Sequence, residues 1–238
     1  MGAVVLPKGR VALLVIDMEN AFVLPGAPFQ IKGAMATIPA CKRVIEASRK
    51  HNVPVFYVKR IYRADGSDVE PARWEKWLDK GRAMQPGSTG VSSAEYVAEI
   101  KPEPGDYTIV KKRWSAFAFN ELDLILRRLG IEAVALTGTT TPNCIRTSAY
   151  DADALGYEVI IIEDCCSSNS PEIQQHNIID LKNMGAIIMS SDDYIQKLPD
   201  IPIANVVNRI RQEMASNPVN PEPITEFEDK TVGWVDKW

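Results

Sequence analysis

The sequence is poor in histidine, the residue that most often serves as a general base or a metal ligand. Only two histidines occur in 238 residues. His51 lies in the segment RKHN at the predicted end of a helix, where a cation suits the terminal carbonyl groups, and His176 lies inside another predicted helix. Both positions argue against Cys-His and Ser-His-Asp sites, and the number alone excludes a histidine-rich metal site.

Long apolar runs, a signal peptide and an excess of basic charge are also missing. No apolar stretch reaches the length needed to span a bilayer, so we expect no membrane association and a cytoplasmic location. The net charge is −4 with both signs interspersed, which argues against nucleic acid as a partner. No GxGxxG or GxxxxGK[ST] motif follows a predicted strand, so the sequence lacks the usual sign of a nucleotide-binding module.

Cysteine is scarce and is not arranged as a framework. The four residues, Cys41, Cys144, Cys165 and Cys166, include an adjacent pair and no CxxC motif. This pattern matches neither a disulfide scaffold nor a zinc knuckle, so we expect four thiols. Cys165 and Cys166 follow a predicted strand end without a lysine or a helix start nearby, which favours simple burial.

What the sequence does contain is a regular alternation of apolar strands with helices. Its 45% apolar and 24% charged residues are ordinary for one large globular domain. Strands are predicted at 11–16, 53–58, 107–110, 133–137, 158–162 and 186–189, and helices at 37–50, 74–78, 120–129, 171–184 and 192–198, with a further helix after Cys144. Apolar rather than alternating strands predict a three-layer, Rossmann-like α/β fold, with a mainly parallel six-stranded sheet and helices on both faces.

Two segments stand apart from this alternation. Residues 60–100 are irregular, and a span of this length is typical of an active-site cover or an oligomer contact. Residues 201–238 form a predicted C-terminal arm beyond a domain at 1–200, rich in Pro, Asn and Glu but carrying Phe227, Trp234 and Trp238. These aromatic residues suggest packing on a neighbouring subunit in a homodimer or homotetramer, although packing on the same subunit is equally compatible.

The segment 133–156 is the most informative for function. Ala133 to Thr137 reads as a buried strand that ends at Gly138, after which Thr141 is predicted as an N-cap and Pro142 as the first helical residue. Cys144 then falls on the first helical turn, where the helix dipole favours a thiolate near neutral pH. Free cysteines are also common in protein cores, and position alone does not separate a nucleophile from inert packing.

Two charged residues are predicted to join Cys144 at one edge of the sheet. Asp17 directly follows the first strand and Lys111 ends the third. The carboxyl ends of parallel strands meet at the edge where α/β proteins bind ligands. A lysine beside a thiol favours the thiolate, and a carboxylate can carry its proton.

Three motifs in this order resemble a known family. The segments LLVIDMENAF, VKKRWSAF and LTGTTTPNC with YDADALGYEVIIIEDCCSS resemble the isochorismatase-like cysteine hydrolase superfamily, from about Val11 to Met189. The resemblance implies that Asp17 is the base, Lys111 its lysine partner and Cys144 the nucleophile. It also implies a cis peptide between Thr139 and Thr140, with the Thr140 and Cys144 N–H groups forming an oxyanion hole. The predicted N-cap conflicts with this, because the Thr141 hydroxyl could accept the Cys144 N–H.

Departures from the family's other branches narrow the expected activity. Residues 63–68 contain none of the histidines with which nicotinamidases hold their metal, so we expect neither a metal nor a cofactor. Members that hydrolyse a vinyl ether replace the nucleophilic cysteine, so Cys144 favours cleavage of a C–N bond in a small linear amide or carbamoyl compound, through a thioester that releases ammonia or amine. A hydrolase of a non-amide substrate and a catalytically silent scaffold stay open.

The substrate pocket is expected near the three catalytic positions. Six nearby residues are candidates for substrate binding: Asn20, Phe22, Arg60, Trp114, Phe117 and Asn143. Core packing is a strong alternative for Phe22 and Phe117, and a solvated surface charge for Arg60.

Overall fold

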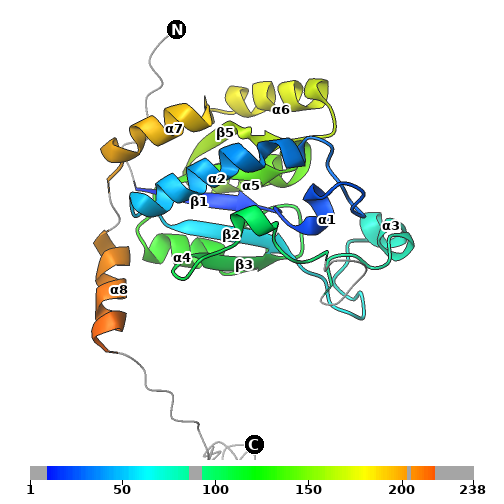
Figure 1. Cartoon of the computed structure of the whole chain (residues 1–238), viewed down its shortest axis with the longest axis horizontal. Coiled ribbons are helices and arrows are strands. Elements are labelled where there is room, and N and C mark those ends of the chain that lie inside the picture. Colours follow the sequence, from blue (N-terminus) through cyan, green and yellow to red (C-terminus); the bar gives the residue numbers. More distant parts are fainter. Residues whose placement is uncertain (1–9, 86–92, 203–204, 218–238) are drawn as a thin grey trace, which may run out of the picture. The chain divides into compact units, whose positions relative to one another are not determined.

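The computed structural model describes residues 10–85, 93–202 and 205–217 (Figure 1). The chain divides into two units, Met1–Ala204 and Asn205–Trp238. Within the described part of the first unit, six parallel strands form one sheet in the order β3-β2-β1-β4-β5-β6. The strands are β1 (Val11–Ile16), β2 (Val55–Arg60), β3 (Tyr107–Lys111), β4 (Ala133–Thr139), β5 (Glu158–Ser167) and β6 (Ile187–Met189).

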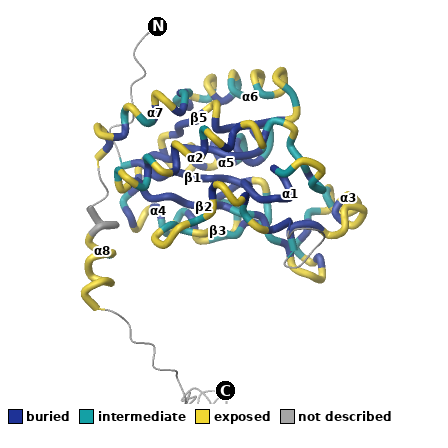
Figure 2. Tube along the Cα trace, in the orientation of Figure 1, coloured by how far each residue is buried: buried dark blue, intermediate teal, exposed yellow. Residues whose placement is uncertain are grey.

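The predicted α/β architecture is confirmed. Helices of the first unit are α1 (Asn20–Val23), α2 (Ala34–Lys50), α3 (Trp74–Asp79), α4 (Leu122–Arg128), α5 (Arg146–Ala154), α6 (Pro171–Asn183) and α7 (Ser191–Lys197), with short 3-10 turns at Pro71–Arg73, Ala98–Ile100 and Leu198–Asp200. The strands are buried along most of their length, whereas the outer faces of the helices are exposed (Figure 2).

The core follows from the alternation of side chains along each strand. Val11, Leu13 and Val15 of β1 belong to one apolar cluster with Val44 and Ile45 of α2. The intervening residues of β1 point to the opposite face because successive side chains alternate, and they are equally buried. A strand buried on both faces needs the unbroken apolar sequence that predicted it.

Strand order reverses between β1 and β4, which lie side by side although 116 residues separate Ile16 from the first residue of β4 at position 133. Ligands of open α/β sheets bind at such a reversal, beyond the carboxyl ends of the strands. Asp17 follows β1 and the Cys144 segment follows β4, so the topology brings both to this point.

The ends predicted for the second, fourth and fifth strands are wrong, since β2 continues to Arg60. Gly138 does not end β4, which continues to Thr139, and β5 continues beyond Ile162 to Ser167. A register shift at Gly138 lets the two strands pair further, through Gly138 with Cys166 and Thr139 with Ser167. The glycine has φ +110°, and a Cβ atom there would lie 2.0 Å from the carbonyl oxygen of Ile16. Glycine is therefore required for the close approach of β4 to β1.

The irregular segment 60–100 is anchored by Trp77. This side chain is buried, donates its indole N–H to the Ala83 carbonyl at 2.8 Å, and packs edge-on against Tyr62. One turn of α3 is thereby fixed to the end of β2, while the outer side of α3 is exposed (Figure 2).

The second unit contains a helix that the sequence analysis did not predict, α8 (Asn205–Ser216). An ion pair one turn apart, Arg209 to Glu213 at 3.7 Å, lies on its exposed surface. Three aromatic residues of the predicted arm, Phe227, Trp234 and Trp238, lie outside the described residues.

Candidate active site

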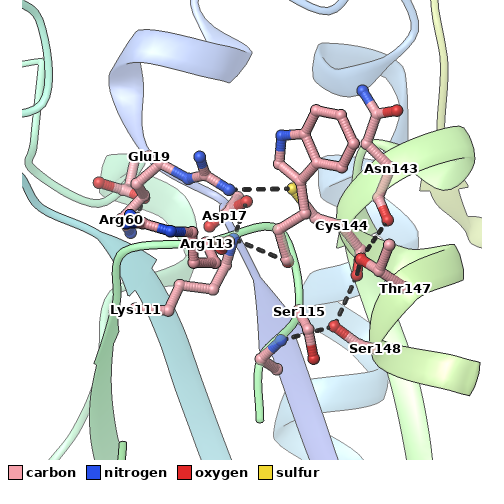
Figure 3. Close-up of polar contacts among 12 residues, drawn as sticks. Asp17, Glu19, Arg60, Lys111, Arg113, Ser115, Asn143, Cys144, Thr147 and Ser148 are labelled. Atoms are coloured by element: carbon pink, nitrogen blue, oxygen red, sulfur yellow. Dashed lines mark hydrogen bonds and ion pairs between the residues drawn. The ribbon is translucent and has the colours of Figure 1, made fainter. Parts of the chain in front are cut away.

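Three side chains from separate strands meet at the carboxyl edge of the sheet. Asp17 follows β1, Lys111 ends β3, and Cys144 lies in a one-turn π-helix, Thr141–Ile145, that follows β4. Figure 3 shows Asp17 and Lys111 together on one side of Cys144. All three are buried, with exposed fractions of 0%, 0% and 5%.

Asp17 is held by its backbone rather than by side-chain hydrogen bonds. It has φ +52°, uncommon for a residue with a side chain, and donates its N–H to the Val58 carbonyl at 2.8 Å. Its Oδ2 lies 2.8 Å from Lys111 Nζ. Apart from Lys111 and the Cys144 thiol, neither carboxylate oxygen has a hydrogen-bond partner in the described part of the chain. A buried carboxylate with spare lone pairs is suited to receive a proton.

The Lys111 ammonium is fixed by three acceptors. Besides Asp17, it donates to the carbonyl groups of Arg113 and Trp114, each at 3.1 Å. Ala116, two residues after Trp114, donates its N–H to the Ser148 hydroxyl. That hydroxyl in turn donates to the Cys144 carbonyl at 2.6 Å. The loop that holds the lysine is thus tied to the helix that holds the cysteine (Figure 3).

Burial decides the protonation of Cys144. It raises the pKa of the thiol, the Asp17 carboxylate raises it further, and Lys111 and Arg60 oppose the change without cancelling it. The expectation that a helix start would favour a thiolate near neutral pH is not met, because burial disfavours the charged form of the thiol. The resting residue is a neutral thiol facing a carboxylate.

The predicted capping role of Thr141 is also wrong. Its hydroxyl contacts the Ser167 carbonyl at 3.1 Å and Gln174 Oε1 at 2.7 Å, not the Cys144 N–H. The cap position is occupied by Thr140, which makes no side-chain capping bond. The expected competition for the Cys144 N–H is therefore absent at Thr141.

The residue between the strand and the helix contributes a backbone donor. The Thr139–Thr140 peptide bond is cis. The Thr140 N–H has no acceptor among the described residues, whereas its hydroxyl donates to the Ser167 carbonyl at 3.1 Å and its carbonyl accepts from Asn143 and Ile145. A free N–H next to the cleft can bind an oxygen that develops negative charge.

Arg60 is the third charged group beside the thiol. It is fully buried at the end of β2, and its Nη2 lies 3.8 Å from Cys144 Sγ. Its Nη1 contacts Glu70 Oε1 at 2.5 Å and Tyr62 Oη at 2.9 Å. Burial opposes the arginine's charge, but Cys144 and Asp17 raise its pKa above the ordinary value. Arg60 is therefore not the solvated surface charge that was considered as an alternative. It is also not among the described residues that line the cleft above Cys144.

Glu19 adds a buried carboxyl behind Asp17. Its Oε2 accepts the Arg60 N–H at 2.7 Å, and its Oε1 has no partner in the described part of the chain. Burial and the negative charge of Asp17 raise the pKa of Glu19 well above its ordinary value. Two carboxyl groups two residues apart thus differ in role: Asp17 pairs with a lysine, whereas burial favours the protonated form of Glu19.

A cleft of about 420 Å³ opens above Cys144. Its walls come from the loop after α1, the α3 segment and the starts of the helices after β4 and β5. Its size is that of a small-molecule site. Of the predicted binding residues, Phe22 and Asn143 line it, together with the predicted oxyanion-hole residue Thr140.

The structure places three of the other predicted binding residues outside this cleft. Trp114, 43% exposed, lines an adjoining cavity of about 170 Å³. Asn20 is buried in α1 and is not among the described residues that line either cavity. Phe117 stacks on Tyr157, with ring centroids 5.9 Å apart, so it packs against the β5 side of the domain instead.

Sequence reasoning missed Glu19, Tyr62 and Glu70. Glu19 stands two residues after Asp17, in a segment for which the sequence predicts no strand or helix, and nothing in its spacing indicates burial. Tyr62 and Glu70 lie in the irregular segment, where no periodicity identifies an inward face. A glutamate eight residues after a tyrosine was the only available signal, and it is too common to be informative.

Among the described residues, no group of three or more His, Cys, Asp or Glu side chains is arranged to hold a metal ion. No described helix is both long and apolar enough to cross a membrane.

Comparison with known proteins agrees with the fold and with these motifs. A family model described as an isochorismatase domain matches residues 11–193. N-carbamoylsarcosine amidase from Arthrobacter sp is 32% identical over 197 residues, 81% of this chain and 73% of that protein. A protein of Arabidopsis thaliana named a probable inactive nicotinamidase is 37% identical over 189 residues, 79% of this chain and 95% of that protein.

Solved structures give the same assignment. An isochorismatase family protein from Desulfovibrio vulgaris is 40% identical, with a TM-score of 0.74, over 81% of this chain and 98% of that one. Fold and site define an α/β protein whose charged groups and buried thiol gather at the strand-order reversal. The chain belongs to the isochorismatase family, and amidohydrolases are among its relatives.

Proposed function

We propose that the protein is a cysteine hydrolase that cleaves the C–N bond of a small linear amide or carbamoyl compound. The observation that carries this proposal is the meeting of the Asp17 carboxylate, the Lys111 ammonium and the Cys144 thiol beside a small cleft. The amidase activity named for the Arthrobacter relative supports the choice of bond.

In this mechanism Asp17 is the base. The thiol is neutral at rest because burial and the Asp17 charge raise its pKa, so it must lose its proton as it attacks. Asp17 lies beside it with unpaired lone pairs and accepts that proton. Lys111 and Arg60 then stand beside the new thiolate, and both favour the charged sulfur.

The thiolate sulfur bonds to the carbonyl carbon, and the carbonyl electron pair moves to oxygen. We assign the Thr140 and Cys144 N–H groups to this oxyanion, a contribution worth about 3 kcal/mol per donor in comparable sites. Asp17 returns the proton to the departing nitrogen as the C–N bond breaks, which releases ammonia or amine and leaves a thioester. Water, deprotonated by Asp17, then hydrolyses the thioester and restores the thiol.

Arg60 completes the charge balance in this proposal. Its guanidinium is held by Glu70 and Tyr62, so it reaches the sulfur with one nitrogen while another is fixed. The fork geometry of arginine allows this division, which a lysine could not reproduce.

Ammonia release tests the proposal. Wild type is screened against ureido acids, carbamoyl amino acids, simple ureides, nicotinamide and maleamate, alongside Cys144→Ala and Cys166→Ala. Cys166 is a matched control, since it is another buried free cysteine at the same end of the sheet. We expect activity in wild type and Cys166→Ala and a loss of at least about 1,000-fold in Cys144→Ala, with melting temperatures close to wild type. Undiminished release by a folded Cys144→Ala protein would refute the thioester route.

A further inference from the structure

The cleft above Cys144 has an uneven charge. Three basic residues line it, Arg73, Lys76 and Lys80, all contributed by the α3 segment. No aspartate or glutamate is among the described residues that line it. A small cleft with cations on one wall attracts an anion, because field lines concentrate between low-dielectric walls.

Two of these cations converge on a single aromatic ring. The Arg73 guanidinium carbon lies 5.1 Å from the centre of the Phe29 ring, and Lys76 Nζ lies 5.4 Å from it. Phe29 is itself buried and lines the cleft. The adjoining cavity of about 170 Å³ shares Phe29, Arg73 and Lys76 with the cleft, so both cations stand at the junction of the two spaces. Two like charges that share one ring repel each other, and an anion bound between them would relieve that repulsion.

The protein offers little compensation of its own. Glu70 is the carboxylate nearest to Arg73, at 3.9 Å, but its two oxygens already contact Arg60 and Tyr62 at 2.5 Å each. Lys76 has no carboxylate within 4.0 Å in the described part of the chain. The Arg73 side chain is only 17% exposed, so solvent screens its charge less than that of a surface residue.

We propose that Arg73, with Lys76 beside it, binds a carboxylate of the substrate, so that the protein acts on amide or carbamoyl acids in preference to neutral amides. This inference rests on the proposed function and names its substrate class. The carboxylate would take the place beside Phe29 while the scissile carbonyl lies over Cys144 in the same cleft. Arginine suits this position because its planar fork matches a carboxylate.

Glu70 gives this arrangement a second consequence. One carboxylate lies between the cation that would bind the substrate, Arg73, and the cation that contacts the thiol, Arg60. An anion that draws Arg73 away from Glu70 leaves Arg60 as the one cation that contacts Glu70 among the described residues, beside the Tyr62 hydroxyl. Binding and the charge at the nucleophile are therefore linked through one side chain.

A matched pair of substrates tests the assignment. N-carbamoyl derivatives of glycine, 3-aminopropanoate and 4-aminobutanoate vary the spacing between carbamoyl group and carboxylate, and N-isobutylurea is a neutral compound close in size to the first. Ammonia release gives kcat/KM for each with wild type, Arg73→Gln and Lys76→Gln. Arg63→Gln is the control, because Arg63 lies on the same segment, is exposed and does not line the cleft.

We expect wild type to prefer the best acid over the neutral urea. That ratio should fall about 10- to 100-fold in Arg73→Gln, chiefly through KM, and less in Lys76→Gln, as expected for one charge-assisted contact. It should keep its wild-type value in Arg63→Gln. Added salt should lower kcat/KM for the acid more than for the urea. An equal preference for both compounds, or a ratio unchanged in Arg73→Gln, would overturn the inference while leaving the hydrolase intact.

A binding measurement separates this inference from the proposed function. Calorimetry with Cys144→Ala and the same acids requires no turnover. Weaker binding of the acid to the Cys144→Ala, Arg73→Gln double variant than to Cys144→Ala supports the carboxylate site even if no substrate in the panel is hydrolysed. Equal binding by both variants contradicts it even if hydrolysis is observed.

Discussion

At the scale of single residues, the site depends on the contrast between charges that are paired and charges that are not. Lys111 has three acceptors and Arg60 has Glu70 and Tyr62, so both cations are fixed. The Asp17 carboxylate keeps unused lone pairs, and the Cys144 thiol keeps its proton. Moving one proton from sulfur to carboxylate therefore transfers charge within a set of groups that need not rearrange.

Asp17→Asn separates the charge effect of the carboxylate from its role as a base. Removing the negative charge should lower the pKa of the Cys144 thiol, since Asp17 raises it while Lys111 and Arg60 remain to lower it. The rate of alkylation by iodoacetamide should then begin to rise at a lower pH than in wild type, although ammonia release is lost. Asp192→Asn, an exposed residue paired with Arg43, is the control. A thiol pKa that rises in Asp17→Asn would contradict the assignment.

Glu19 makes a prediction about stability. Its carboxyl ionises near 4.5 in the unfolded chain but keeps its proton to much higher pH in the folded protein. The folded state binds more protons over that interval, so the free energy of unfolding should fall as pH rises above 4.5. Glu19→Gln has no proton to lose and should show a flatter profile, with a gain of roughly 1–3 kcal/mol at the alkaline end.

Urea denaturation over a pH series measures this effect. The two proteins should have similar stability in acid and diverge as pH rises. Parallel profiles for wild type and Glu19→Gln would show that Glu19 is not protonated in the folded protein.

At the scale of elements, the sequence predicted the sheet edge but not what lies behind it. Asp17 and Lys111 could be placed together because unbroken apolar runs identify parallel strands, and parallel strands share a carboxyl edge. Arg60 ends β2 at the same edge, yet its burial depends on Glu70, ten residues along an irregular segment. Periodicity carries no information about such a segment, so a buried arginine there reads as a surface charge.

The end of β4 shows the same limit. Glycine usually ends a strand, but Gly138 continues one, because its missing side chain is needed for contact with β1. Only the position of Ile16 in space reveals this requirement, and no local pattern does.

Gly138→Ala should therefore be severely destabilising. The alanine would have to adopt a φ of +110°, which is unfavourable for a residue with a side chain. Its Cβ would also lie 2.0 Å from the Ile16 carbonyl oxygen. Gly185→Ala is a close control, since its φ is +108° and no atom lies within 4 Å. We expect a loss of about 1 kcal/mol for Gly185→Ala from φ alone, and at least about 3 kcal/mol for Gly138→Ala, with ammonia release impaired because Asp17 follows Ile16. Equal losses in thermal or urea unfolding would contradict the role given to the close approach.

At the scale of the whole molecule, chemistry is concentrated where strand order reverses. The six-stranded parallel sheet and the family could both be read from the sequence, because three motifs and six apolar runs specify them together. Helix α8 could not be predicted from the sequence, since its residues follow a proline-rich stretch and belong to a separate unit of the chain. The basic wall of the cleft was also not predictable, because Arg73 and Lys76 acquire their meaning only where α3 meets Phe29.

The proposal that the C-terminal arm assembles subunits is tested by truncation. Deleting residues 218–238 removes Phe227, Trp234 and Trp238 but leaves the described units. If the arm packs on a neighbouring subunit, the number of chains per particle in analytical ultracentrifugation should fall while the ammonia-release rate per chain is retained. An unchanged number of chains per particle would show that these aromatic residues do not hold an oligomer together.

The central claim, that the Cys144 sulfur performs the reaction, is tested most directly by titrating that thiol. Wild type is alkylated in steps with iodoacetamide, the modified residue is located by peptide mass spectrometry, and residual ammonia release is measured at each step. We predict that activity falls in proportion to the fraction of Cys144 modified and reaches zero when modification is complete, with Cys41, Cys165 and Cys166 unmodified. Full activity in protein whose Cys144 is completely alkylated would contradict the account.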